Sequence, residues 1–342
     1  GTGNMAGQHA RSYAAIPGAS VVAGVDTSPE RLADFRKANG IPRGFATLAE
    51  ALAWGEFDAV SNVTPDPVHH PTTMACLAHG KHVLCEKPLA VNAEDAEEMA
   101  QAAAAAGVVN MVNLSYRRVP GLIHAARMVA DGQIGEVRHF EASYLQSWLL
   151  QDAWGKWDED PTWLWRLSSA HGSKGVLGDI GVHVLDFATY AAGLDVRDVS
   201  CRLVTFDKAP GGRIGEYVLD ANDSFTKHLA LDSGAVGVGH ASRMAAGQVD
   251  DLFLRLYGTK GGIDLSYVGK VSKLRVCLGA DMRSGTWQDV ETPPVATNFE
   301  RFVGAIRGTS APAPDFARGA ALQRVLDRAV DSDAAGGAIL AV

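Results

Sequence analysis

The sequence predicts two domains: an α/β domain with a doubly wound parallel sheet, and an α+β domain with an open, mostly antiparallel sheet. In residues 1–118, short apolar runs alternate with helical patterns, as in parallel sheets. In residues 119–342, strand-like runs follow one another across short turns, which is typical of antiparallel sheets. With 342 residues, 47% of them apolar, the chain can fill two cores.

The composition excludes several classes of protein. The net charge of −8 argues against nucleic acid as a partner, because that role needs a basic surface. No apolar run approaches the roughly 20 residues of a membrane helix. The four cysteines form no CxxC pair, so we expect neither a zinc knot nor a redox dithiol. Reduced cysteines fit a soluble protein in the cytoplasm.

The elements of the first domain follow one another in order. Residues 1–6 read Gly-Thr-Gly-Asn-Met-Ala, the pattern G-x-G-x-x-G/A, and open a helix that extends to about residue 15. Because the strand that normally precedes this loop is absent, we expect a further strand upstream. Strands are predicted at residues 20–25, 57–63, 81–85 and 108–114. Helices are predicted at residues 29–38 and 71–79. A further short helix opens with the capping box Thr47–Glu50, and another has Asn92 as its N-cap and closes at residue 107.

The glycine loop indicates dinucleotide binding. Gly1 permits the tight turn, and Gly3 lets the backbone around Asn4 and Met5 approach a pyrophosphate at the helix N-terminus.

Asp26 ends the strand at residues 20–25, about 20 residues beyond the loop, where a Rossmann domain places the carboxylate that binds the adenosine ribose. A carboxylate repels a 2′-phosphate, and Thr27 and Ser28 follow it instead of an arginine, so NAD is preferred over NADP. The alternative is an aspartate that begins a turn.

The strand at residues 81–85 ends in Glu86-Lys87-Pro88. Ligands collect at the carboxyl ends of parallel strands, so these side chains are candidate site residues. Pro88 moves Lys87 out of the helical region, into an extended or cis geometry. The alternative is a surface charge pair beside a turn proline.

These motifs resemble the glucose-fructose oxidoreductase / inositol dehydrogenase / MocA family of NAD(P)-dependent oxidoreductases. The resemblance covers essentially the whole chain and rests on residues 1–6, Thr64-Pro65 with His69, Gly-Lys-His-Val-Leu-Cys-Glu-Lys-Pro at 80–88, and Gly-Asp-Ile-Gly-Val-His at 178–183. It implies that Thr64, Pro65 and His69 line the cofactor. It also implies that Glu86 contacts the nicotinamide ribose and that Lys87 reaches both ribose and substrate. Ser115 occupies a slot where the family usually has asparagine, whereas Arg117 matches as a cofactor residue. The alternative for Arg117 is solvated charge at a domain junction.

The second domain contains strand-like runs separated by turns. These runs lie at residues 137–146, 198–206, 224–231, 235–243, 252–257 and 274–278. A final helix at about 316–329 is a candidate to pack back on the first domain. The family resemblance implies that one face of this sheet forms the subunit interface, in a homodimer or homotetramer.

Five of the seven tryptophans lie between residues 148 and 166: Trp148, Trp154, Trp157, Trp163 and Trp165. Tryptophan faces stack on sugar rings, so this segment is a candidate substrate wall. We select Trp148, Trp165 and Arg166 as substrate contacts, with Gln146 at the end of the preceding strand. The alternative is loop packing or an oligomer contact.

Asp179 and His183 lie four residues apart at the start of a helix predicted over residues 180–191, so they share one helix face. Asp179 can also serve as N-cap, and the alternative for His183 is a core histidine. The family resemblance places the catalytic aspartate and histidine in this segment. Asp186, one turn further, belongs to the same cluster or is structural.

The sequence thus predicts an NAD-dependent dehydrogenase that oxidises a hydroxyl of a sugar, an anhydrosugar or a cyclitol. His183 is the candidate base, Asp179 its orienting acid, and Lys87 the group that favours ionisation of the hydroxyl. A lysine relay with an orienting histidine is the alternative order. No metal is expected, because no His/Cys/Asp cluster has ligand spacing. Two rival functions are an NAD-assisted glycoside-cleaving enzyme and a non-catalytic dinucleotide-binding sensor.

Overall fold

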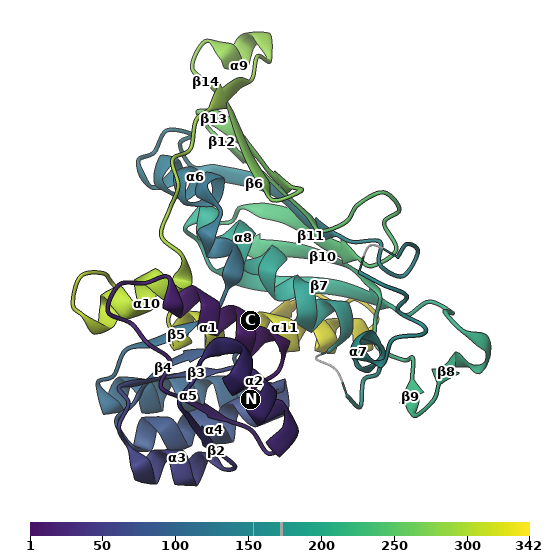
Figure 1. The fold of residues 1–342 in the computed structure, drawn as a ribbon. Coiled ribbons are helices and arrows are strands. Elements are labelled where there is room, and N and C mark those ends of the chain that lie inside the picture. The colour runs from purple at the N-terminus through teal and green to yellow at the C-terminus, as the bar shows by residue number, and fades with distance from the viewer. Residues whose placement is uncertain (153, 172–173) are drawn as a thin grey trace. The chain divides into compact units, whose positions relative to one another are not determined.

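The computed structural model describes residues 1–152, 154–171 and 174–342 (Figure 1). It divides the chain into two compact units. The first comprises Gly1–Ser115 and Ala296–Gln323, and the second comprises Tyr116–Val295 and Arg324–Val342. This division differs from the predicted single boundary after residue 118, because a late segment of the chain belongs to the first unit.

The first unit contains two parallel sheets and their helices. Strands β1 and β2 form one pair, and β3, β4 and β5 form a three-stranded sheet in that order. The strands are β1 (Ala23–Val25), β2 (Arg43–Phe45), β3 (Ala59–Asn62), β4 (His82–Cys85) and β5 (Asn110–Val112). The helices are α1 (Asn4–Ala14), α2 (Pro29–Asn39), α3 (Leu48–Trp54), α4 (Asp66–Ala78), α5 (Ala93–Ala106), α10 (Asn298–Ile306) and the beginning of α11 (Phe316–Ala334).

A cavity of about 420 Å³ separates the two sheets of this unit. Residues 20–25, which include β1, and residues 57–63, which include β3, line it with mostly apolar side chains. We do not assign the cofactor to this cavity, because ligands of such sheets bind outside the carboxyl ends of the strands.

Local sequence signals explain most helix ends. The capping box of Thr47 and Glu50 and the N-cap Asn92 are both confirmed. The predicted start of α4 at residue 71 is wrong, because the helix begins at Asp66. Pro67 is tolerated there because the N–H groups of a first helical turn have no intrahelical partner.

Helix α10 was missed, although Thr297 and Glu300 form a capping box at its start. Its residues Phe299, Phe302 and Ile306 join Leu84 of β4 and Met111 of β5 in one apolar cluster. Burial of this apolar face explains why Ala296–Gln323 belongs to the first unit.

The second unit is built on a nine-stranded sheet in the order β15-β14-β13-β12-β6-β11-β10-β7-β16. Strands β6 and β11 are parallel and the other neighbours are antiparallel, so the predicted mostly antiparallel sheet is confirmed. Helices α6 and α8 pack against this sheet (Figure 1). The strands are β6 (Val137–Leu145), β7 (Val196–Val204), β10 (Ser224–Leu231), β11 (Val236–Ser242), β12 (Asp251–Gly258), β13 (Gly261–Val268), β14 (Val271–Leu278), β15 (Gln288–Val290) and β16 (Leu340–Ala341). The remaining elements are η1 (Ser115–Arg118), α6 (Pro120–Ala130), α7 (Pro161–Leu164), η2 (Trp165–Leu167), η3 (Leu177–Gly181), α8 (Val182–Ala192), η4 (Pro210–Gly212), β8 (Arg213–Ile214), β9 (Tyr217–Val218) and α9 (Asp281–Ser284).

The segment that carries Asp179 differs from its prediction. Residues Leu177–Gly181 form a π-helical turn, η3, that continues into α8. Asp179 therefore lies inside a helix, and the proposed N-cap role is wrong. Such π turns occur frequently at functional sites. Among the described residues, no helix combines the length and apolar character needed to cross a bilayer.

Candidate active site

Asp26 anchors the glycine loop of the first unit. Its Oδ2 accepts hydrogen bonds from the Thr2 backbone N–H (2.8 Å) and hydroxyl (2.9 Å), and its Oδ1 accepts from the Ser28 N–H (2.8 Å) and Arg31 Nη2 (3.0 Å). Burial raises the pKa of Asp26, but these four hydrogen bonds outweigh burial and hold the pKa below its usual range. Asp26 is therefore ionised at neutral pH.

The loop fits a bound pyrophosphate. Gly3 is the N-cap of α1 and provides no side-chain cap, so the first N–H groups of the helix remain for an anion. A Cβ added at Gly3 would meet nothing within 4 Å, whereas one at Gly1 would lie 3.0 Å from the Val63 carbonyl oxygen. The first position thus needs glycine for a close backbone approach, and the second faces open space.

Arg31, which lies beside Asp26, was not predicted from the sequence as a site residue. It lies in the first turn of α2, five residues after Asp26, and its side chain is 62% exposed. The sequence did contain this signal, because positions in a first helical turn lie close to the end of the preceding strand. Arg31 places a positive charge beside the Asp26 carboxylate.

Glu86 lies in a buried polar network at the end of β4. Its Oε1 is 2.8 Å from His9 Nε2 and accepts from Asn113 Nδ2 at 2.6 Å, while its Oε2 accepts from the Lys87 N–H at 3.2 Å. His9 Nδ1 in turn lies 2.6 Å from the Ser61 hydroxyl. Burial raises the pKa of Glu86, but His9 and Asn113 outweigh it, so the pKa falls below its usual value. His9 and Asn113 were both missed from the sequence.

Thr64 and His69 come together with the end of the Glu-Lys-Pro segment. Asn62 Oδ1 accepts from the Thr64 hydroxyl at 2.7 Å. The His69 ring lies between two carbonyl oxygens, with Nε2 2.8 Å from that of Thr64 and Nδ1 2.9 Å from that of Pro88. The Lys87–Pro88 peptide is cis, one of the two predicted geometries. The structure thus joins the loops that follow β3 and β4.

Arg117 forms a buried ion pair in the second unit. Its Nε and Nη2 donate to the two carboxylate oxygens of Asp186 at 2.7 and 2.8 Å, and its guanidinium lies 3.4 Å from the centre of the Tyr190 ring. Such a bidentate pair is geometrically specific. It ties η1 to α8, which favours the structural alternative for Asp186.

Asp179 is held by arginine side chains. Arg243, which is fully buried, donates from Nη2 to Asp179 Oδ2 at 2.9 Å and from Nη1 to the Arg166 carbonyl oxygen at 3.2 Å. Arg166 Nε lies 3.9 Å from the same Asp179 oxygen. Burial lowers the pKa of Arg243 although Asp179 opposes that shift. Arg243 was missed, because it lies 64 positions from Asp179.

His183 is buried on α8 against a tyrosine. The Tyr116 ring meets it edge to face, with centroids 4.8 Å apart. The Tyr116 hydroxyl hydrogen-bonds the Tyr144 hydroxyl, which donates to Asp250. Gln146 also donates to Asp250, at 2.9 Å. Burial raises the pKa of Tyr116 far above its ordinary value, so its hydroxyl stays protonated.

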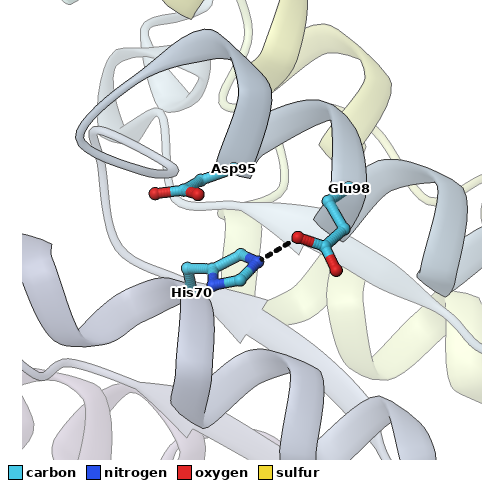
Figure 2. A group of neighbouring side chains, drawn as sticks. All are labelled: His70, Asp95 and Glu98. Carbon is cyan, nitrogen blue, oxygen red and sulfur yellow. Dashed lines mark hydrogen bonds and ion pairs between the residues drawn. The ribbon is translucent and has the colours of Figure 1, made fainter.

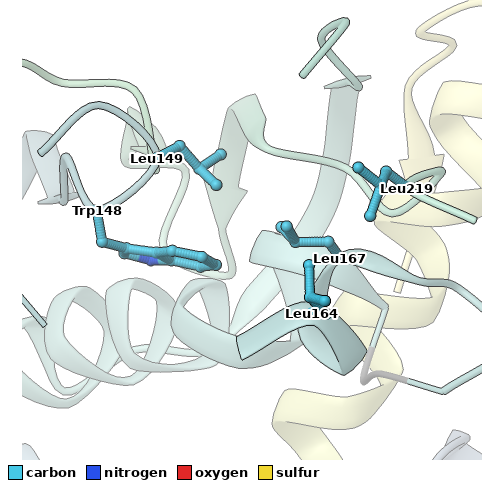
Figure 3. Close-up of a cluster of buried hydrophobic side chains, with 5 residues drawn as sticks. All are labelled: Trp148, Leu149, Leu164, Leu167 and Leu219. Carbon is cyan, nitrogen blue, oxygen red and sulfur yellow. The ribbon is translucent and has the colours of Figure 1, made fainter. Parts of the chain in front are cut away.

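The tryptophan-rich segment contributes to a small core. Trp148 is 4% exposed and packs in one cluster with Leu149, Leu164, Leu167 and Leu219 (Figure 3). This burial favours loop packing for Trp148.

Trp165 lies outside that cluster and is partly exposed, with the Arg166 guanidinium 4.2 Å from the centre of its ring. Trp165 and Arg166 therefore remain candidates for substrate contact.

A histidine and two acids also meet between α4 and α5. His70 Nε2 lies 2.8 Å from Glu98 Oε2 (Figure 2). Asp95 accepts from Asn92 at 3.0 Å. Glu98 is more than half exposed. An exposed ion pair and a helix cap account for these positions, and we assign them no further role.

Comparisons with known proteins match both units. The family described as "Oxidoreductase family, NAD-binding Rossmann fold" matches residues 1–114, and "GFO/IDH/MocA C-terminal domain" matches residues 122–264. Levoglucosan dehydrogenase of Pseudarthrobacter phenanthrenivorans is 28% identical over 305 residues, which are 82% of this chain and 75% of that protein. The 1,5-anhydro-D-fructose reductase of Ensifer adhaerens is 37% identical over 172 residues, 49% of this chain and 48% of that protein.

Solved structures agree over the whole chain. An oxidoreductase domain protein from Kribbella flavida is 30% identical with a TM-score of 0.85, covering 99% of this chain and 94% of that one. A levoglucosan dehydrogenase in complex with NADH and levoglucosan is 25% identical with a TM-score of 0.87, covering 100% and 97%. Since the two family models match residues 1–114 and 122–264 and the solved structures cover nearly the whole chain, the chain belongs to the Gfo/Idh/MocA family of NAD(P)-dependent oxidoreductases and has its NAD-binding Rossmann domain.

Proposed function

We propose that this protein is an NAD-dependent dehydrogenase that oxidises a hydroxyl of a sugar, an anhydrosugar or a cyclitol. The observation that carries the proposal is the buried, ionised Glu86 directly before Lys87 at the carboxyl end of β4. Relatives named for levoglucosan, 1,5-anhydrofructose and inositol support a polyol substrate.

Residues of the first unit would hold the cofactor. Gly1, Gly3, Asn4 and Met5 would bind the pyrophosphate at the N-terminus of α1, and the ionised Asp26 would accept from the adenosine ribose.

At the nicotinamide end, Thr64, Pro65 and Glu86 would bind the ribose. When bound, NAD supplies the hydride acceptor. The bidentate pair of Arg117 with Asp186 assigns to Arg117 the positioning of α8, in place of a cofactor contact.

Lys87, Asp179 and His183 would handle the hydroxyl proton. The Lys87 ammonium donates to the substrate hydroxyl and favours its ionisation, and the His183 imidazole accepts the proton. Asp179, fixed by Arg243, orients the proton acceptor. The reverse order, in which Lys87 relays the proton and His183 orients the substrate, uses the same residues. Trp165 and Arg166 would contact the sugar ring and its hydroxyls.

A substrate screen tests this proposal. Sugars, anhydrosugars and cyclitols are incubated with NAD and NADP in parallel while NADH or NADPH absorbance is followed. Lys87→Ala and His183→Ala should each lower kcat by orders of magnitude on the best substrate while NAD still binds. The exposed Lys37 on α2 provides the matched control, since Lys37→Ala should leave kcat unchanged. Near-normal turnover by both site variants would refute the assignment, and turnover without net NADH would point to glycoside cleavage.

A further inference from the structure

The His69 ring is fully buried, and each of its nitrogens faces a carbonyl oxygen. Nδ1 lies 2.9 Å from the Pro88 oxygen and Nε2 lies 2.8 Å from the Thr64 oxygen. A carbonyl oxygen accepts hydrogen bonds and cannot donate one. Both contacts are hydrogen bonds only when both nitrogens carry a proton, and the ring is then an imidazolium. A neutral ring would leave one lone pair against a carbonyl oxygen.

The surroundings of His69 stabilise a positive charge. Asp66 begins α4 one turn before His69, and its Oδ2 has no hydrogen-bond partner in the described part of the chain. The Cys85 sulfur at the end of β4 also interacts with the ring. Burial by itself lowers the pKa of His69, but Cys85, Asp66 and the Pro88 carbonyl raise it to about 10. This shift has the same direction as the two carbonyl contacts, which need a ring that carries both protons.

We propose that His69 is a positioning residue: a constant imidazolium that ties the loop after β3 to the loop after β4 and so fixes the backbone that carries Lys87. This inference rests on the proposed catalytic role of Lys87. It gives His69 a different function from the cofactor contact that the family resemblance implies.

The two loops need such a tie because the strand ladder ends before them. The last pair in register between β3 and β4 is Asn62 with Cys85, and the Glu86 N–H donates to the Asn62 carbonyl at 2.9 Å. Beyond that point, His69 links Thr64 to Pro88, the residue directly after Lys87. A displacement of about 1 Å at a catalytic group can cost on the order of 100-fold in rate, so loss of one hydrogen bond here should be visible in kcat.

The kinetic test compares two adjacent histidines of α4. In His69→Gln the side-chain amide can donate to one of the two carbonyl groups, but its oxygen opposes the other. His70→Gln is the matched control, because the His70 side chain is partly exposed and pairs with Glu98. We expect His69→Gln to lower kcat about 100-fold with KM and the NAD dissociation constant within threefold. His70→Gln should change none of these values more than threefold, and an unchanged kcat in His69→Gln would overturn the proposal.

A spectroscopic test needs neither substrate nor turnover. The protein is labelled with [15N]histidine, and the His69 signals are identified by their loss in His69→Gln. We expect two ring N–H protons and two protonated ring nitrogens from pH 6 to pH 8.5. A neutral tautomer at pH 7 would overturn the proposal even if every prediction about Lys87 held. Conversely, a failed substrate screen would leave this result standing, so the two proposals can fail separately.

Discussion

Lys227 is a buried lysine whose replacement should stabilise the protein. It lies on β10 with its side chain in the core, 1% exposed, and its Nζ has no hydrogen-bond partner among the described residues. The Phe225 ring lies close to this charge, with 4.7 Å between Nζ and the ring centre. Burial lowers its pKa from the ordinary 10.5 to about 8, although the neighbouring Cys201 opposes this shift.

The pKa shift of Lys227 gives the size and sign of its effect on the free energy of unfolding. One pKa unit corresponds to 1.36 kcal/mol, so the charged Lys227 costs about 3 kcal/mol of stability at pH 7. Between about pH 8 and 10.5 the unfolded chain binds this proton and the folded chain does not, so stability rises with pH in that window. Lys227→Met keeps the chain length without the charge, so it should raise Tm at pH 7 by roughly 6–12 °C for a unit of this size.

Differential scanning calorimetry of both proteins at pH 7 and 9.5 measures this effect. The increase in Tm caused by Lys227→Met should fall at pH 9.5 to less than half of its value at pH 7, because Lys227 in the folded protein is then neutral. Lys208→Met is the control. Lys208 forms a buried ion pair with Asp223, and its loss would strand that carboxylate at a cost of about 3–5 kcal/mol. A Tm for Lys227→Met that is unchanged at pH 7, or raised equally at both pH values, would refute the desolvation argument.

Three further predictions concern the active site. Asp26→Asn should narrow the ratio of kcat/KM for NAD over NADP about tenfold or more, because the charge that repels a 2′-phosphate is lost; an unchanged ratio would discredit the ribose role. Arg243→Met should lower kcat about 10- to 100-fold by releasing Asp179, and Arg243→Lys should recover part of that loss. Equal kcat values in the wild type and both variants would contradict a positioning role for Arg243. Tyr116→Phe keeps the ring against His183 and should stay within threefold of wild-type kcat, while Tyr116→Leu should lose about tenfold; matching values for the two variants would show that the ring contact is irrelevant.

Local signals singled out the candidate cofactor residues, whose roles remain predictions. Asp26 and Glu86 directly follow β1 and β4, which apolar runs reveal, and the glycine loop precedes α1. Capping boxes are equally local, and the one at Thr297 shows that α10 could have been found in the sequence. The start of α4 was placed five residues late, although Pro67 is compatible with a first helical turn because no N–H is needed at its position.

The missed residues share a physical cause. His9 lies 77 positions before Glu86, and Asn113 lies 27 positions after it, yet both reach the same carboxylate oxygen. Periodicity and spacing report only what a chain segment does locally. Contacts between strands that pair across long loops follow from topology, which a single sequence with no alignment does not reveal.

The same distinction applies to the chemistry of Asp179. Its place four residues before His183, in the helix formed by η3 and α8, is a local property of the chain. Its charge is balanced by Arg243, which follows β11 and is completely buried. A buried arginine without its acid is strongly unfavourable, so loss of either Asp179 or Arg243 should destabilise the fold. Removing Asp179 should therefore reduce both activity and stability, because it leaves the buried Arg243 without its acid.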